Sequence, residues 1–194
     1  MASRGYEGLM SSRRSFHNIA LIGFMGVGKS TVGALVASLL NFELVDTDKV
    51  IEDRTGRRIP DIFATDGEPA FRAMENGLVV ELESARNKVI ATGGGLPVNP
   101  ANLESLSRHA YVVCLWASVE VIYQRVRQQT HRPLLHTADP TAKIRDLLQA
   151  RAPVYRQADL LVGVDYRSPA ESARLIVNAF RQTRVSPSEN HVLP

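Results

Sequence analysis

Short apolar runs recur along the chain and alternate with segments of mixed polarity. Each run is short and rich in β-branched or other large apolar residues, which is typical of a buried strand. The runs predict five strands, at residues 19–23, 42–46, 89–92, 111–116 and 160–164. After the first run, apolar residues repeat at helical spacing from Val32 to Leu40, and Asn41 provides a stop. Because parallel strands need helical crossovers, the pattern predicts a three-layer α/β/α fold around a five-stranded parallel sheet.

The segment 48–87 is too long to be one crossover helix. It is interrupted at Thr55-Gly56, at Pro60 and at Asp66-Gly67, all of which break helices. We therefore predict two short helices followed by a longer one from about Pro69. An insertion of this kind is able to reach over the carboxyl edge of the sheet, where open α/β folds bind their ligands.

The segment 129–140 lies between two helical patterns, at 119–127 and 141–155. It contains Pro133 and Pro140 and shows little periodicity, so we predict a mobile loop that acts as a lid. The polar leader at 1–16 and the tail at 185–194, with its two prolines, are predicted to be disordered. The remainder, 17–184, suits one compact domain.

Composition narrows the classes of protein without choosing a function. The chain of 194 residues is 44% hydrophobic and 22% charged, and no apolar run reaches the ~20 residues that cross a bilayer. The net charge of +3 could suit a nucleic acid or an anionic small substrate, but the basic residues are scattered and have no aromatic interleaving, so composition alone favours neither partner. The one cysteine, Cys114, lies in an apolar run and is interpreted as a buried strand thiol.

The leader indicates where the protein acts. It contains arginines and serines but no continuous apolar core of the kind that a secretory signal requires. A truncated transit peptide would share this bias, yet the segment is short for one and contains Glu7. We therefore expect a cytoplasmic protein.

The strongest motif follows the first predicted strand. The sequence GFMGVGKST, from Gly23 to Thr31, fits the phosphate-binding pattern G-x-x-x-x-G-K-[ST] in its strand-loop-helix context. Its glycines let backbone N–H groups turn inward around phosphate oxygens, at the positive end of the following helix. Lys29 would add a charge for the β- and γ-phosphates, and Ser30 would place its hydroxyl on Mg²⁺. The loop predicts nucleotide binding but does not distinguish ATP from GTP, or a kinase from an ATPase.

Polar residues follow the second predicted strand as Asp46-Thr47-Asp48. Side chains two apart in an extended segment point the same way, so one carboxylate could support Mg²⁺ through water while the other holds a substrate hydroxyl. The alternative is that these aspartates cap the helix that follows. The two interpretations stay open on these residues alone.

Further candidates lie at the next strand and on the helices. Thr92 is followed by three glycines, Gly93 to Gly95, which let a backbone approach a ligand closely. Arg72 and Arg151 could bind a carboxylate or phosphate, although a single arginine is more often a solvated surface charge. Arg132 lies in the predicted lid and could close over a transferring phosphoryl group.

Together these motifs resemble the shikimate kinase family. GFMGVGKST, DTD, IPDIFATDGEPAFRAME, TGGG, RPLL and RAPVY occur in that family's order and at similar spacings, from about Asn18 to Thr183. The resemblance implies a sheet like that of nucleoside monophosphate kinases. It also implies transfer of the γ-phosphoryl group of ATP to the 3-hydroxyl of shikimate, in the pathway to aromatic amino acids. We expect one Mg²⁺ per subunit and a monomeric protein.

The resemblance also implies roles for single residues. Asp48 would hold the substrate hydroxyls, Arg72 and Arg151 the carboxylate, and the Gly94 backbone a further contact. Asp46 would serve Mg²⁺ through water, with Ser30 as a direct ligand. Lys29, Asp48 and Arg132 would be the catalytic residues, and Glu75 could orient Arg72 from the next helical turn. The expected ATP-binding residues are Gly26, Val27, Gly28, Lys29, Ser30, Thr31, Arg125, Arg132 and Arg167.

Some alternatives remain at this point. Arg125 and Arg127 can each be aligned with an arginine that stacks on adenine, and Arg125 is favoured. Gluconate kinases share the motif of the phosphate loop, but Arg72, Gly94 and Arg151 argue against that acceptor. A nucleoside monophosphate kinase would have to house a second base. A binding module without activity would not need Lys29, Ser30, Asp48 and Arg132 together.

Overall fold

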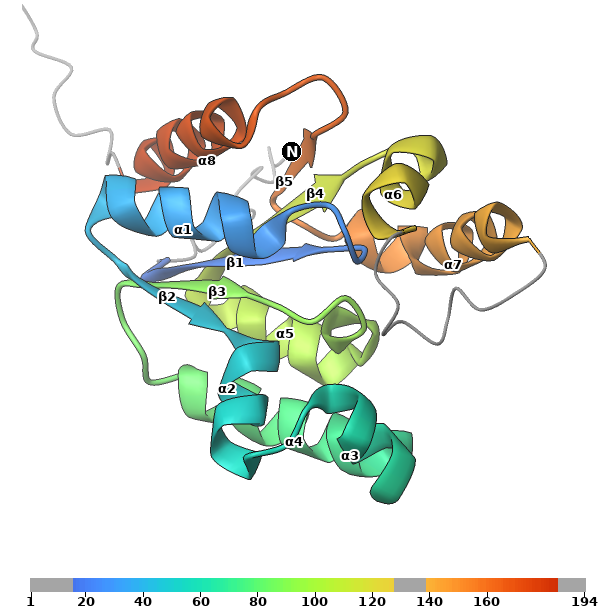
Figure 1. The fold of residues 1–194 in the computed structure, drawn as a ribbon. Coiled ribbons are helices and arrows are strands. Elements are labelled where there is room, and N and C mark those ends of the chain that lie inside the picture. The colour runs from blue at the N-terminus through green and yellow to red at the C-terminus, as the bar shows by residue number, and fades with distance from the viewer. Residues whose placement is uncertain (1–15, 128–138, 185–194) are drawn as a thin grey trace, which may run out of the picture.

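The computed structural model describes residues 16–127 and 139–184, and Figure 1 shows their arrangement. The predicted leader and tail lie outside the described residues, except for Phe16, whose ring packs edge-on against Tyr111 at a centroid distance of 5.4 Å. Most of the predicted lid also lies outside them. Within the described residues, no helix is long and apolar enough to cross a membrane.

All five predicted strands are present in one parallel sheet with the order β2-β3-β1-β4-β5. Their bounds are β1 Asn18–Gly23, β2 Glu43–Asp46, β3 Lys88–Ala91, β4 Ala110–Trp116 and β5 Leu160–Gly163. The central strand β1 pairs with β3 on one side and with β4 on the other. Because all strands run in the same direction, the loops that follow them meet at one edge of the sheet.

Helices cover both faces of the sheet, which confirms the predicted three-layer α/β architecture (Figure 1). Helix α1, Lys29–Leu40, packs with α8, Pro169–Arg184, above the sheet in this view. Helix α5, Pro100–His109, covers the opposite face. A short 3₁₀ turn, η1, at Leu96–Val98 precedes it in the chain. Helices α6, Val119–Val126, and α7, Pro140–Tyr155, pack together at the β5 side.

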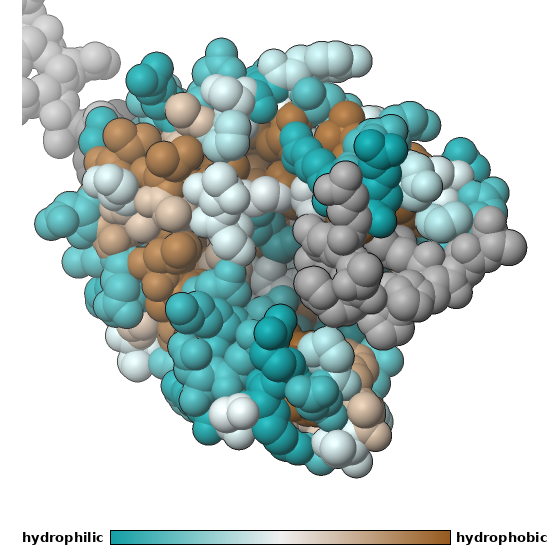
Figure 2. Space-filling model, viewed as in Figure 1, coloured by the Kyte–Doolittle hydropathy of each residue, from teal (hydrophilic) through white to brown (hydrophobic). Residues whose placement is uncertain are grey.

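The insertion has the predicted three helices. They are α2 Thr47–Thr55, α3 Ile59–Thr65 and α4 Gly67–Leu82. Helix α2 ends at Gly56, which has a left-handed φ of 65°, and α4 begins two residues before the expected Pro69. Figure 2 shows hydrophilic side chains over this part of the molecule, whereas hydrophobic side chains gather over α1 at the left. The insertion is thus solvated outside and packed inside, where Ile62, Phe71 and Leu78 are buried.

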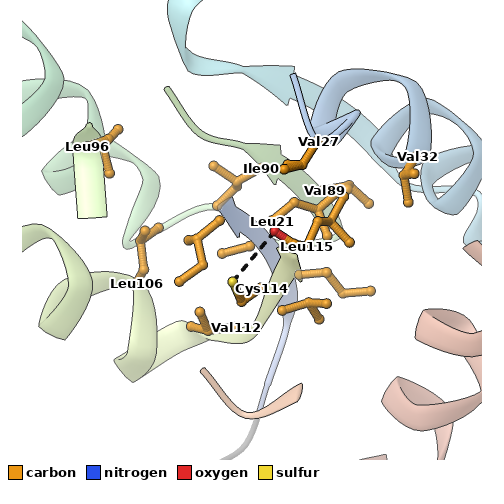
Figure 3. Close-up of a cluster of buried hydrophobic side chains, with 14 of the residues drawn as sticks. Leu21, Val27, Val32, Val89, Ile90, Leu96, Leu106, Val112, Cys114 and Leu115 are labelled. Carbon is orange, nitrogen blue, oxygen red and sulfur yellow. Dashed lines mark hydrogen bonds between the residues drawn. The ribbon is translucent and has the colours of Figure 1, made fainter. Parts of the chain in front are cut away.

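The main core lies between β1, β3, β4 and the helices on either face. Figure 3 shows Leu21, Ile90 and Leu115 around Cys114, whose side chain is 0% exposed. Burial raises the pKa of the Cys114 thiol to about 12, because the thiolate would lose its hydration. The interpretation of Cys114 as a buried strand thiol is confirmed.

Candidate active site

A cavity of about 490 Å³ lies along the carboxyl edge of the sheet. The phosphate loop and Lys29 line it together with Asp46 at the end of β2, Asp48 on α2, Gly94 after β3, and Arg167 after β5. These residues are far apart in sequence and meet because parallel strands end at the same edge. The structure therefore brings together most of the predicted site.

The phosphate loop leads from β1 directly into α1. Gly26 has a φ of 78°, and a Cβ there would lie 2.6 Å from Cγ1 of Val126 on α6, so this position requires glycine. Gly28, at φ 95°, is the N-cap of α1, and no side chain of the described residues caps this helix. The first N–H groups of α1 are thus left to bind an anion.

Lys29 lies folded over the loop and is only 9% exposed. Its Nζ donates hydrogen bonds to the backbone oxygens of Gly23 and Phe24, each at 2.9 Å. These carbonyl oxygens position the ammonium group. The charge therefore stays close to the N–H groups that would surround a phosphate.

Asp46, at the end of β2, is a helix cap, which is one of the two interpretations of these aspartates. The Asp46 carboxylate caps α2 by accepting from Lys49 N at 3.2 Å, and its Oδ2 also accepts from Ser30 Oγ at 2.5 Å. Hydroxyl and carboxylate oxygens are ligands that suit Mg²⁺. In the described part of the chain, no group of three or more His, Cys, Asp or Glu could hold a metal. Such a sparse site fits an ion that is bound mainly by nucleotide phosphates and water.

Asp48 lines the cavity from a helix and not from the expected extended segment. Helix α2 begins at Thr47, so Asp46 and Asp48 do not belong to one extended segment, and the argument from alternation was wrong. Both carboxylates nevertheless line the cavity. Thr47 is buried, and its Oγ1 accepts a hydrogen bond from Gly93 N at 2.9 Å. A Cβ at Gly93 would lie 2.4 Å from Asp48 Oδ1, so the glycine makes room for this carboxylate.

Arg72 is held on α4 by two glutamates. Its Nη1 donates to Glu75 Oε2 and its Nη2 to Glu68 Oε1, both at 2.7 Å. Glu68 is exposed, whereas the Glu75 side chain is only 1% exposed. Burial raises the pKa of Glu75, although the hydrogen bond from Arg72 acts to lower it. The expected contact of Glu75 with Arg72 is therefore present.

Arg151 on α7 reaches the loop after β3. Its Nη1 donates to Gly94 O at 2.9 Å, and the hydroxyl of Tyr155 donates to the same oxygen at 3.4 Å. Gly94 lines the cavity, whereas Arg151 and Arg72 are not among the residues that line it. Tyr155 is buried and had no assigned role in the sequence, where only its place in RAPVY drew attention.

The expected nucleotide arginines differ in their positions. Arg125 on α6 donates to the backbone oxygens of Val27, at 3.3 Å, and of Val164, also at 3.3 Å. It lines the cavity, as does Arg167, which donates to Gly163 O at 2.7 Å. Arg127 is exposed at the end of α6 and is not part of the cavity wall. Arg132 lies outside the described residues.

Comparison with known proteins gives one family. A sequence model of the shikimate kinase family matches residues 25–181. Shikimate kinase from Thermodesulfovibrio yellowstonii is 42% identical over 165 residues, which are 85% of this chain and 95% of that protein. Shikimate kinase from Halorhodospira halophila is 44% identical over 173 residues, which are 89% of this chain and 98% of that protein.

Solved structures agree with the sequence relatives. Shikimate kinase from Acinetobacter baumannii in complex with shikimate superposes with a TM-score of 0.83 and 38% identity, over 89% of this chain and 97% of that one. A gluconokinase from Sinorhizobium meliloti, at 18% identity and a TM-score of 0.51, shares the fold alone. The family model and the two close relatives each span most of the chain that carries the cavity. The chain therefore belongs to the shikimate kinase family.

Proposed function

We propose that this protein transfers the γ-phosphoryl group of ATP to the 3-hydroxyl group of shikimate. The products are shikimate 3-phosphate and ADP, on the pathway to aromatic amino acids. The observation that carries this proposal is the cavity itself, which joins a phosphate loop to Asp48 and to Gly94, the residue whose backbone oxygen accepts a hydrogen bond from Arg151. Family membership and the Acinetobacter structure with shikimate support the same acceptor.

The acceptor would lie at the Asp48 end of the cavity. We assign its carboxylate to Arg72 and Arg151, since a guanidinium binds a carboxylate through two parallel hydrogen bonds. Asp48 would accept hydrogen bonds from its hydroxyls, and the backbone of Gly94 would make a further contact. This arrangement holds a small anion between two cations and points its hydroxyls at the phosphate loop.

ATP would lie with its phosphates in the loop and its base near β5. The N–H groups of Gly26 to Thr31 and the ammonium of Lys29 would bind the β- and γ-phosphates. Arg125 and Arg167 would flank the adenine, because both line the cavity beyond the loop. Arg132 would reach the phosphates from the lid.

The donor set at Ser30 and Asp46 fits one Mg²⁺ per subunit. Ser30 Oγ would be a direct ligand, and Asp46 would act through a water molecule. Bound there, the ion would neutralise phosphate charge during transfer.

The chain's own residues would do the remaining work by alignment and charge. In the reaction the shikimate oxygen forms a bond to the γ-phosphorus, and the bond to the bridging oxygen breaks, leaving its electron pair on ADP. Asp48 would orient the attacking hydroxyl and accept its proton. If Asp48 is a general base, Asp48→Asn should lower turnover at saturating shikimate by about 10²–10⁴-fold. Near-normal turnover in that variant would leave Asp48 an orienting group only.

The direct experiment measures ADP formation from Mg-ATP with shikimate, gluconate or a nucleoside monophosphate, beside a control without acceptor. We expect turnover that depends on shikimate. Turnover on gluconate alone would overturn the acceptor and the roles of Arg72 and Arg151. ATP binding without turnover on any acceptor would indicate a binding module.

We also propose an organisation of the whole chain around this reaction. Residues 17–184 would form a single kinase domain, in which 48–87 bind the acceptor and 129–140 close as a lid over ATP. The protein would act in the cytoplasm as a monomer, without nucleic acid or membrane. Gel filtration of the full chain tests the monomer, and hydrogen exchange over 129–140 with and without both substrates tests the lid.

A further inference from the structure

The two arginines assigned to the carboxylate are held by groups of different charge. Arg72 pairs with Glu68 and Glu75, each at 2.7 Å. The ion pairs found among the described residues do not include Arg151. Its contacts are with neutral groups, namely the Gly94 backbone oxygen, the Tyr155 hydroxyl and the ring of Phe24, whose centroid lies 5.4 Å from Arg151 Cζ.

A neutral support has a chemical advantage at this position. A carboxylate that positions a guanidinium also neutralises it and competes with a substrate anion for the same N–H groups. The face of an aromatic ring attracts the cation through its quadrupole and occupies none of those groups. Arg151 is thereby oriented while its positive charge stays available to the acceptor.

Phe24 is well fixed for this purpose. It is only 1% exposed and directly follows β1, at the start of the phosphate loop. Its backbone oxygen accepts a hydrogen bond from Lys29 Nζ at 2.9 Å. Phe24 thus contacts two cations. Its carbonyl contacts Lys29, which is expected at the ATP phosphates, and its ring contacts Arg151, which is expected at the acceptor.

We propose that Phe24 is a positioning residue for the acceptor: its ring holds Arg151 in the orientation that binds the carboxylate. This inference rests on the proposed function, since it takes Arg151 as a carboxylate ligand. The ring acts on the acceptor through Arg151, whereas the contact with Lys29 is made by the backbone and survives a change of side chain. Removing the ring should therefore affect the two substrates unequally.

The test compares Phe24→Leu with the wild type in steady-state kinetics. We expect KM for shikimate to rise by about 2- to 30-fold, the range of a cation–π contact, while kcat and KM for ATP change by less than about 2-fold. In an Arg151→Gln background, Phe24→Leu should have no further effect on KM for shikimate. With the uncharged methyl ester of shikimate, kcat/KM of wild type and variant should be nearly equal.

Phe180→Leu is the matched control, because Phe180 is also 1% exposed but packs against Phe42 and Tyr111. It should lower stability and leave KM for shikimate unchanged. Phe24→Met is the second variant if Phe24→Leu does not fold, since methionine adapts to the space and has no ring.

The outcomes separate the two proposals. No shikimate turnover by the wild type would overturn the proposed function. Turnover with an unchanged KM for shikimate in the ring-less variant would overturn only the role of Phe24. An equal rise in both KM values, or an undiminished effect in the Arg151→Gln background, would make Phe24 an ordinary core residue and would equally overturn it.

Discussion

The two halves of the cavity differ in the groups that form them, which are backbone groups at one half and side chains at the other. At the half proposed for the nucleotide, one continuous loop presents the first N–H groups of α1 and binds Lys29 through its carbonyls. At the half proposed for the acceptor, Asp48 on α2 lines the cavity, and the side chains of Arg72 on α4 and Arg151 on α7 lie beside Gly95 and Gly94. Glu75 fixes Arg72, and the Gly94 carbonyl fixes Arg151. Backbone geometry tolerates many side chains, whereas a side-chain network depends on each member. The acceptor half should therefore be the more sensitive to single substitutions.

Lys29 is the main exception, and its removal should have the largest effect. We expect Lys29→Met to lower kcat/KM by about 10³-fold or more, because a buried cation beside the transferring phosphate is lost. Lys49→Met, an exposed lysine on α2, should change it by less than about 2-fold. Residual activity above a tenth of the wild type would show that backbone N–H groups alone suffice at the nucleotide half.

A single methyl group should disrupt the acceptor half. Gly93→Ala places a Cβ 2.4 Å from Asp48 Oδ1, so we expect kcat to fall by about 10²-fold as the carboxylate is displaced, and stability to fall by about 1–3 kcal/mol. Kinetics and thermal unfolding measure the two effects. The control is Gly77→Ala on α4, where a Cβ meets nothing within 4 Å. That change should stabilise the protein by about 0.5–1 kcal/mol, since alanine is the better helix former.

Glu75 should make the stability of the folded protein depend on pH. Burial raises its pKa in the folded protein above the ordinary value of 4.5, so ionisation costs more in the folded state than in the unfolded state. Below 4.5 the carboxyl is protonated in both states. As pH rises from 4.5 through the raised folded pKa, the wild type should lose stability relative to Glu75→Gln. Urea unfolding of both proteins between pH 4 and pH 8 measures this difference.

Glu68→Gln is the control for that series, because Glu68 pairs with the same arginine but is 61% exposed. Removing this exposed charge should change the free energy of unfolding by only about 0–1 kcal/mol. A stability difference for Glu75→Gln that does not change with pH would mean that Arg72 fully offsets the burial of the charge.

The smallest effect should come from a hydroxyl at the nucleotide half. Ser172 on α8 lines the cavity and is 0% exposed, and its Oγ has no hydrogen-bond partner among the described residues. Ser172→Ala should raise the free energy of unfolding by about 1 kcal/mol, because an unsatisfied buried group is removed. Ser168→Ala should lower it by about 1 kcal/mol, since Ser168 Oγ hydrogen-bonds to Glu171 in the first turn of α8. Equal signs for the two variants would show that Ser172 is satisfied.

The difference between local backbone structure and long-range side-chain contacts also explains which features could be predicted from the sequence. The strands, the phosphate loop and the breaks at Gly56 and Gly67 were predictable because each depends on a few neighbouring residues. The contacts of Phe24 with Arg151 and of Thr47 with Gly93 join residues far apart in the chain, and no local pattern encodes them. Asp48 was expected at the site for a wrong local reason, because helix α2 begins one residue after β2 ends. The roles of Arg72 and Arg151 came from the family resemblance.

The central position of β1 has a consequence for folding while the chain is being synthesised. This strand is synthesised first, yet its partners in the sheet are β3 and β4, which begin at Lys88 and Ala110. Contacts between residues so far apart form late, because a long loop of chain must close before they are made. A nascent chain that has emerged only as far as the insertion carries the whole phosphate loop but no sheet to hold it. We therefore expect nucleotide binding to begin only after β4 has left the ribosome, so that ATP would stabilise the finished domain rather than guide its assembly.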